Sequence, residues 1–332
     1  MMTIFTAASI VSPVAHADGV SCQAYDVPVT LAVDPPAQTV YGELCVPQNG
    51  ATTVFVLLHG TTYNHLYYDL PYQPESYSLA DRLNRAGYAT FNLDKVGAGN
   101  SSRPPSASVV TSVMADALHQ VIQGLRAGAF NATTFSKVAF VGHSGGAIIG
   151  VIESLTYGDM DGLVLEGLAH ILDPNETANF FNMMYPATQD PKFAGQPLDS
   201  GYVTTRPGTR DFFHSISEPV AELVAFDEAN KDVYPLSPAD DGLLQVVIQG
   251  RTRELTVPVL VGIGSEDRFY CTPLSMDCSS NEAVYAQEAE FYGPQAQLRT
   301  FLLPRAGHNL TMAHNTKRYQ RAVVRWAHDF ID

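Results

Sequence analysis

Basic residues are scarce in this chain. It has 19 lysines and arginines against 34 aspartates and glutamates, which gives a formal net charge of −15. No basic run offsets this balance, so nucleic acids and anionic membrane surfaces are disfavoured as partners. The excess of negative charge is typical of soluble proteins and indicates no particular ligand.

Long apolar runs are missing after the first residues. No later run approaches the ~20 apolar residues that a membrane span needs, so we expect no stable membrane insertion. Residues 1–17 are themselves small and apolar and end in Ala15-His16-Ala17, a small-x-small pattern that favours cleavage by signal peptidase. A positively charged start is absent, so we interpret residues 1–17 as a shortened signal peptide; the alternative is an N-terminal extension without that role. The interpretation predicts a secreted protein, either extracellular or periplasmic.

Cysteine is rare, with four residues in 332. An even number in an exported chain favours disulfides, and pairing of sequence neighbours, Cys22–Cys45 and Cys271–Cys278, is preferred among the three connectivities. Four buried free thiols are the alternative. The chain has no Cys-x-x-Cys or His-x-x-x-His pair, so the spacing indicates no metal site, and nothing in the sequence implies a cofactor.

The most informative motif ends an apolar, strand-like run at residues 137–142. It reads Gly142-His143-Ser144-Gly145-Gly146, the pattern Gly-x-Ser-x-Gly of a nucleophile elbow. A serine between two glycines fits a sharp strand-to-helix turn, because side chains at the glycine positions would clash with the neighbouring strand and helix. The pattern predicts a nucleophilic Ser144; a helix N-cap serine is the alternative.

Other polar residues follow predicted strands farther along the chain. The run at 53–58 leads into His59-Gly60-Thr61-Thr62, the run at 257–264 into Ser265-Glu266-Asp267, and the run at 298–303 into His308. Because the carboxyl ends of parallel strands meet at one edge of a sheet, we expect these residues to lie near Ser144.

With these motifs the chain resembles the α/β-hydrolase family, in which serine, acid and histidine occur in that order after strands. The resemblance implies a catalytic triad of Ser144, Asp267 and His308. It also implies an oxyanion hole formed by the backbone N–H groups of Thr61 and Gly145, with Thr62 as an alternative to Thr61. Some members carry an aspartate at the elbow and open epoxides or displace halide, and Ser144 argues against that group.

Several residues compete for these roles. Glu266 and Glu166 are alternatives to Asp267 as the acid, and His314 and His328 are alternatives to His308, although both lie in a helical pattern. We interpret His143 and His59 as packing residues. The segment 94–99 follows a strand and contains two glycines, but it lacks the spacing of a phosphate-binding loop and fits a tight strand exit.

The order of the predicted elements gives the same fold class. Length and a 45% apolar content fit one α/β domain over residues 18–332. An antiparallel hairpin at 24–47 precedes an alternation of strands and helices, which includes a helix at 75–87. This alternation implies a mostly parallel central sheet with helices on both faces. From about 171 to 253 the alternation stops, and we predict an inserted, largely helical lid with helices at 176–184, 210–215 and 218–230. The predicted fold is therefore an α/β-hydrolase fold.

Two groups of side chains are candidates for contact with the substrate. Tyr63, His65 and Tyr67 follow the predicted oxyanion residue directly, and Phe181 and Met184 belong to the predicted lid. Binding pockets are mainly apolar, so these residues favour a substrate with a bulky apolar group. Ordinary packing is the alternative for both groups.

The sequence therefore predicts a serine hydrolase that cleaves a small-molecule apolar ester or lactone through an acyl-enzyme on Ser144. A peptidase, amidase or thioesterase could use the same triad, and a noncatalytic binding protein on this scaffold is a further alternative. The sequence leaves the oligomeric state open.

Overall fold

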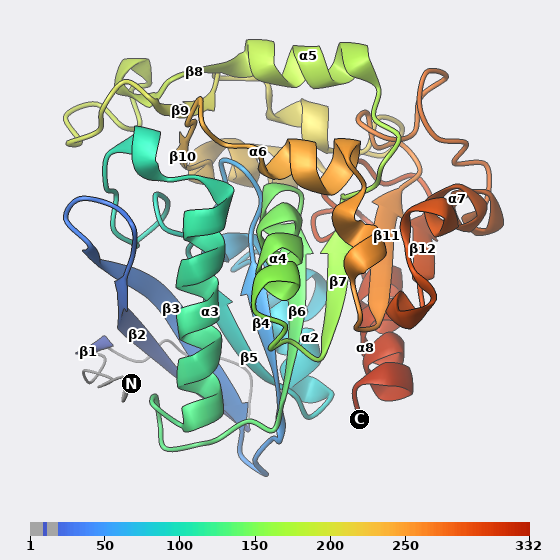
Figure 1. Cartoon of the computed structure of the whole chain (residues 1–332). Coiled ribbons are helices and arrows are strands. Elements are labelled where there is room, and N and C mark those ends of the chain that lie inside the picture. The colour runs from blue at the N-terminus through green and yellow to red at the C-terminus, as the bar shows by residue number, and fades with distance from the viewer. Residues whose placement is uncertain (1–8, 12–18) are drawn as a thin grey trace.

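A nine-stranded sheet forms the centre of the molecule, in the strand order β1-β2-β3-β5-β4-β6-β7-β11-β12 (Figure 1). The computed structural model describes residues 9–11 and 19–332. Most of the predicted signal peptide lies outside the described residues; within it, β1 (Ser9–Val11) pairs antiparallel with β2. No helix in the described part of the chain is long and apolar enough to span a membrane.

The first edge of the sheet is an antiparallel hairpin of β2 (Val20–Thr30) and β3 (Ala37–Pro47). Its register places Cys22 directly opposite Cys45, and the two form a disulfide. The predicted hairpin is therefore present, and β3 joins it to the rest of the sheet by pairing antiparallel with β5.

The other six strands run parallel to one another. They are β5 (Ala89–Leu93), β4 (Thr53–Leu58), β6 (Lys137–His143), β7 (Gly162–Glu166), β11 (Val259–Gly264) and β12 (Arg299–Leu303). Their runs are almost continuously apolar because both faces of the sheet are covered. Within β4, Val54 and Val56 belong to the core on one face, whereas Phe55 and Leu57 belong to the core on the other.

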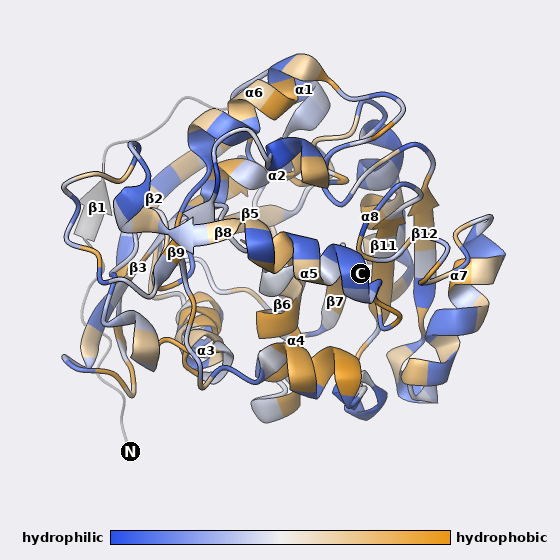
Figure 2. Ribbon diagram, turned by 90° about the horizontal axis from the view of Figure 1, so that it is seen from above, coloured by the Kyte–Doolittle hydropathy of each residue, from blue (hydrophilic) through white to orange (hydrophobic). Residues whose placement is uncertain are grey.

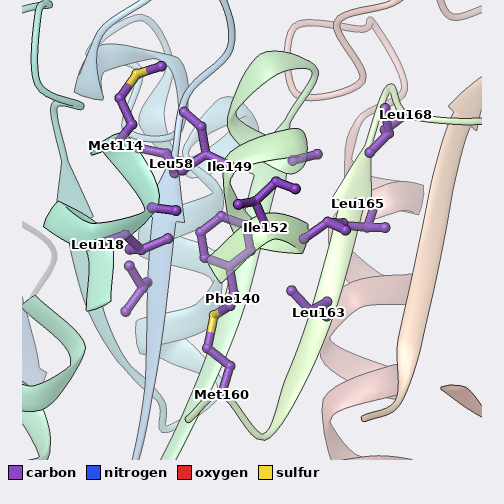
Figure 3. Close-up of a cluster of buried hydrophobic side chains, with 14 of the residues drawn as sticks. Leu58, Met114, Leu118, Phe140, Ile149, Ile152, Met160, Leu163, Leu165 and Leu168 are labelled. Carbon is purple, nitrogen blue, oxygen red and sulfur yellow. The ribbon is translucent and has the colours of Figure 1, made fainter. Parts of the chain in front are cut away.

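Helices cover both faces, as the alternating pattern predicts. On one face lie α3 (Thr111–Ala127) and α4 (Gly145–Thr156), and on the other lie α2 (Leu79–Arg85) and α8 (Lys317–Phe330), while α7 (Asn281–Glu288) flanks β12. Figure 3 shows Phe140 of β6 packed beneath Ile149 and Ile152 of α4. This close packing fixes the helix that begins at the Gly-x-Ser-x-Gly motif.

One predicted helix is interrupted. The pattern at 75–87 predicts a single helix, but the structure has α1 (Pro74–Tyr77) followed by α2. Ser78 adopts an extended backbone between them, and its hydroxyl accepts a hydrogen bond from the Asp81 N–H as an N-cap. A serine prefers this capping position to a helix interior, which accounts for the break.

The chain between β7 and β11, residues 167–258, is an insertion, and most of it lies above the carboxyl ends of the parallel strands; its last residues run down to the start of β11 (Figure 1). We call it the inserted segment. Its elements are α5 (Pro174–Met183), α6 (Ala221–Asn230), the short turns η3 (Ala187–Gln189), η4 (Arg210–Phe213), η5 (Leu244–Ile248) and η6 (Arg251–Glu254), and the strands β8 (Met184–Pro186), β9 (Tyr202–Thr205) and β10 (Tyr234–Pro235).

The prediction of a largely helical insertion is incomplete, because β8, β9 and β10 form a three-stranded antiparallel sheet. Strands of two to four residues are too short to produce a recognisable alternation. The segment also has a small apolar core of its own, formed by Ala187, Phe193, Tyr202 and Val233.

Candidate active site

The Gly-x-Ser-x-Gly motif forms a strained turn between β6 and α4. Ser144 has φ +51° and ψ −118°, a conformation that non-glycine residues rarely adopt. A Cβ at Gly142 would lie 2.7 Å from the Ala147 Cα, and one at Gly146 would collide with the carbonyl oxygen of Leu58. Both glycines are therefore required sterically, and the turn leaves Ser144 partly exposed at a pocket.

His308 lies beside the carboxylate of Asp267. Its Nδ1 is 2.8 Å from Asp267 Oδ2, and both side chains are buried. The other carboxylate oxygen accepts a hydrogen bond from the Phe269 N–H at 2.9 Å, which fixes the carboxyl group. Among the described residues, His308 Nε2 has no hydrogen-bond partner. This nitrogen is therefore available to accept a proton.

Residues at the end of β7 contact both the serine turn and the His308–Asp267 pair. The Ser144 N–H donates to the Glu166 carbonyl oxygen at 2.8 Å. The next residue, Gly167, packs against the His308 ring so closely that a Cβ there would lie 2.9 Å from Cε1. The His143 ring, which precedes Ser144, is 4.8 Å from the His308 ring between centroids. The three predicted residues are thus gathered at one end of the sheet.

The competing acids have other partners. Glu266 accepts hydrogen bonds from the Ser215 hydroxyl and from the N–H groups of Ile216 and Ser217 in the inserted segment. Glu166 accepts hydrogen bonds from Tyr67 at 2.6 Å and from the Thr311 N–H, and burial raises its pKa.

The competing histidines are also engaged elsewhere. His314 pairs with Glu218 at 2.8 Å and His328 with Asp332 at 2.5 Å. Of the candidate residues weighed from the sequence, Asp267 and His308 are the acid and histidine that contact each other.

The predicted oxyanion groups lie together on the floor of the pocket. A Cβ on Gly145 would be 3.5 Å from the Thr61 backbone nitrogen, and both residues line the pocket. Thr62 does not line the pocket; it is fully buried, and its hydroxyl accepts a hydrogen bond from Arg210 at 2.7 Å. The placement favours Thr61 over Thr62 as the second donor.

A buried lysine lies behind this loop. Lys95 Nζ donates to the Gly60 carbonyl oxygen at 2.7 Å and lies 2.9 Å from His59 Nδ1. Burial lowers the pKa of Lys95 to about 7, and burial together with the Lys95 charge lowers the pKa of His59. The Gly60 carbonyl and the Thr61 N–H belong to one peptide group, so a donor on the carbonyl strengthens the N–H as a donor. The sequence predicts only a strand exit at 94–99; the signal for this role is a lysine two residues after a buried strand.

A buried ion pair of the inserted segment contacts the loop that carries Thr61 and Thr62. Arg210 donates to Asp227 through Nε at 2.9 Å and to the Thr62 hydroxyl, and its guanidinium lies 4.1 Å from the centre of the Tyr63 ring. Both charged side chains are almost completely buried. This ion pair could not be predicted from the sequence, because Arg210 and Asp227 belong to separate elements.

The pocket beside Ser144 has a volume of about 290 Å³ and is mainly apolar. Ile148 of α4 and Phe269 of the acid loop form part of its wall, and α5 and its end contribute Phe180, Phe181 and Met184. Phe181 and Met184 are thus placed where the sequence predicts substrate contacts. Helix α5, which has no fully buried residue, mixes hydrophilic and hydrophobic residues above the strands (Figure 2).

Tyr63, His65 and Tyr67 do not line this pocket, which corrects their expected role. Tyr63 and Tyr67 are buried; the first donates to Asp227 at 3.2 Å, and the second donates to Glu166 and stacks on His143. The His65 ring pairs with Asp94 at 2.9 Å. The aromatic loop packs beneath the inserted segment, so its rings stabilise the site without reaching the pocket.

The second disulfide braces the loop that carries the acid. Cys271 and Cys278 are bonded, and the Cys271 N–H donates to the Asp267 carbonyl oxygen at 2.7 Å. The adjacent Thr272 hydroxyl donates to Asp173, the N-cap residue of α5. The loop therefore connects the acid to the helix above the pocket.

Comparison with known proteins agrees with this arrangement. The sequence pattern that defines the family described as "Alpha/beta hydrolase family" matches residues 55–322. The chain belongs to the alpha/beta hydrolase family. The matched region contains the serine turn, the acid and the histidine. No curated protein matches the sequence.

Solved structures of similar fold include hydrolases with different substrates. The esterase Pf2001 of Pyrococcus furiosus is 14% identical over 92% of this chain and 90% of that chain, with a TM-score of 0.54. A meta-cleavage product hydrolase, CumD, of Pseudomonas fluorescens is 16% identical over 91% and 97%, with a TM-score of 0.57. The serine hydrolase CarC, involved in carbazole degradation, is 15% identical over 91% and 99%, with a TM-score of 0.52. At these identities the likeness shows the fold, and together with the family it supports a hydrolase.

Proposed function

We propose that this alpha/beta hydrolase is a serine esterase that acts on a carboxylic ester or lactone with a bulky apolar group. The observation that carries the proposal is the buried Asp267–His308 hydrogen bond, with His308 Nε2 left unpartnered in the described structure near the strained Ser144. A nucleophile, a base and a group that orients the base are the parts that acyl transfer requires.

In the proposed reaction, His308 Nε2 accepts the Ser144 proton as the hydroxyl oxygen attacks the ester carbonyl. Asp267 holds the imidazole in the tautomer that leaves Nε2 free, and it stabilises the imidazolium that forms. The N–H groups of Thr61 and Gly145 donate to the oxyanion. His308 then protonates the leaving alcohol, and a water deprotonated by the same imidazole releases the acid from the serine.

The pocket supports an apolar substrate of moderate size. A cavity of roughly 150 Å³ can hold benzene, so a volume of about 290 Å³ fits an aryl group or a medium-length acyl chain. The lining beside Ser144 is mainly Ile148, Leu168, Phe180, Phe181 and Phe269. We propose that the inserted segment acts as a lid, with α5 as the roof of this pocket.

A kinetic test uses p-nitrophenyl esters of graded acyl length, an aromatic lactone and a matched p-nitroanilide. The proposal predicts that Ser144→Ala abolishes ester turnover. Ser154→Ala is the matched control, because it changes a serine on α4 outside the pocket, and it should retain turnover. Faster turnover of the anilide or of a thioester would instead favour the amidase or thioesterase alternative. A folded protein with no turnover and no labelling by a fluorophosphonate would favour the noncatalytic alternative.

We also propose that the protein is secreted. The two disulfides fit an oxidising compartment, and the small-x-small pattern at 15–17 fits signal-peptide cleavage. Fractionation of cells expressing the chain, with the N-terminus of the exported form identified by mass spectrometry, tests this. Retention of the uncleaved chain in the cytoplasm would contradict it.

A further inference from the structure

A second cluster of chemically reactive side chains lies away from the pocket. His119 on α3, Glu153 on α4 and Asp159 in the loop after α4 each offer a ligand-type atom, and these atoms lie within 4.8 Å of one another. His119 Nδ1 is 2.8 Å from Asp159 Oδ2 and 3.6 Å from Glu153 Oε1. None of the three residues lines the pocket beside Ser144.

Three carboxylate oxygens in this cluster are buried without a hydrogen-bond partner among the described residues. They are both carboxylate oxygens of Glu153 and Asp159 Oδ1. The Glu153 side chain is completely inaccessible to solvent. Buried polar groups in native proteins are nearly always satisfied, and burying an unpaired carboxylate is especially costly. Three such oxygens beside the His119 imidazole therefore indicate a ligand that satisfies them together.

Neighbouring groups orient two of these side chains. The Tyr157 ring stacks on His119 with centroids 3.8 Å apart and an interplanar angle of 11°. Gln123 Nε2 donates to Asp159 Oδ2 at 2.6 Å. The nearby Arg126 is engaged with the Asp159 carbonyl oxygen and the Asp161 carboxylate. Outer contacts of this kind are typical of ligands that are held ready for a metal ion.

We propose that His119, Glu153 and Asp159 bind a divalent cation of the zinc type. One imidazole nitrogen and two carboxylates form a donor set that zinc accepts, and a water reaching the partly exposed His119 side would complete a tetrahedral shell. Calcium prefers six to eight oxygen ligands, which this cluster does not offer. The cation accepts the lone pairs of the buried carboxylate oxygens that have no hydrogen-bond donor in the described part of the chain.

The position of the site indicates a structural role. Glu153 follows Ser144 by nine residues, so the site lies about 13 Å along α4 from the serine turn. A cation there joins α3, α4 and the loop that leads to β7. The sequence contains no zinc motif for this site, because the ligands come from α3, from α4 and from the loop after α4 rather than from one short pattern.

The experiment titrates Zn²⁺ into full-length protein that has been treated with a chelator and desalted, using calorimetry and thermal unfolding. We expect one Zn²⁺ per chain with low-micromolar or tighter affinity and a Tm that rises with Zn²⁺ concentration. His119→Gln and Glu153→Gln should each abolish both effects. The matched control His314→Gln removes an imidazole that pairs with Glu218 elsewhere, and it should bind as the unaltered protein does.

Two results would overturn the proposal: no Zn²⁺ binding by the unaltered protein, or unchanged binding by His119→Gln. His119 is partly exposed, so its variant keeps the test decisive even if Glu153→Gln fails to fold. A larger Tm rise with Ca²⁺ than with Zn²⁺ would overturn the assignment to a zinc-type ion. Because neither readout uses ester turnover, the result is independent of the proposed esterase activity.

Discussion

At the scale of single residues, the contact between His308 and Asp267 distinguishes this acid from its sequence neighbour. The chain places Glu266 and Asp267 side by side, yet Glu266 accepts hydrogen bonds from the inserted segment and Asp267 accepts one from the histidine. The turn after β11 separates the two side chains, so adjacent carboxylates serve different partners.

This separation predicts different outcomes for two similar substitutions. Asp267→Asn should lower kcat by about 10⁴, because an amide at this position favours the wrong imidazole tautomer. Glu266→Gln, the matched control, should leave kcat nearly unchanged while loosening residues 215–217. Steady-state kinetics of both variants with one p-nitrophenyl ester make the comparison, and equal losses of kcat would contradict the assignment of the acid.

Lys95 leads to a prediction about stability and pH. Burial lowers the pKa of Lys95 from 10.5 to about 7, so between these values the unfolded chain holds a proton that the folded chain has released. The Lys95 contribution to stability is therefore full above about pH 10 and declines as the pH falls toward 7.

Lys95→Met should remove this dependence. The difference in unfolding free energy between the unaltered protein and Lys95→Met should change steadily in favour of the unaltered protein from pH 7 to pH 10, as measured by urea denaturation. The exposed Lys137→Met variant controls for the loss of a lysine. A difference that does not vary with pH would show that Lys95 keeps its proton throughout.

At the scale of elements, charged side chains as well as apolar contacts attach the inserted segment to the loop that carries Thr61. Arg210 in η4 pairs with Asp227 in α6 and also donates to Thr62 in the loop that carries Thr61. A backbone hydrogen bond makes a second contact with the same loop: the Asp232 N–H donates to the Thr62 carbonyl oxygen at 2.8 Å. The loop is thus held from above by two independent contacts.

Removing the arginine should destabilise the protein and impair the reaction together. Arg210→Met removes the guanidinium partner of the buried Asp227 and leaves that carboxylate with His214 and Tyr63. Breaking a buried ion pair typically costs about 3–5 kcal/mol of unfolding free energy. We also expect a lower kcat, since the Thr61 loop loses a support. Arg206→Met, an exposed arginine of the same segment, should change neither quantity appreciably. Chemical denaturation and ester kinetics on both variants test this, and a near-neutral Arg210→Met would contradict it.

The elements differ in how well the sequence predicted them. The parallel strands were predictable because continuous apolar runs indicate strands that are buried on both faces. The serine turn was predictable because the two glycines indicate a turn too tight for larger side chains. The three-stranded sheet of the inserted segment was not, because strands of two to four residues show no period. Lys95 and Arg210 were missed for another reason: each acts through a partner that is distant in sequence.

At the scale of the whole molecule, the two disulfides lie at opposite sides of the sheet. Cys22–Cys45 joins β2 and β3 at one edge, whereas Cys271–Cys278 closes a loop after β11, near the other. The first is remote from the pocket, and the second lies beside the acid and the N-cap of α5. The two bonds should therefore affect different properties.

We expect the paired substitutions Cys22→Ala with Cys45→Ala to lower the unfolding free energy by about 3 kcal/mol and to leave kcat unchanged. Cys271→Ala with Cys278→Ala should lower kcat several-fold, because Asp267 and α5 lose a shared brace. Denaturation and ester kinetics on the two double variants provide the comparison. A loss of kcat confined to the first pair would contradict this division of roles.

Helix α5 has a further consequence for how this protein can change. None of its residues is fully buried, yet Thr177, Phe180 and Phe181 face the pocket. Exposed positions tolerate substitution at little thermodynamic cost, whereas replacement of a buried lining residue such as Leu168 disturbs the main core. Variant libraries confined to α5 should therefore yield many stable proteins with new substrate preferences. Substrate preference can therefore change through α5 at little cost in stability.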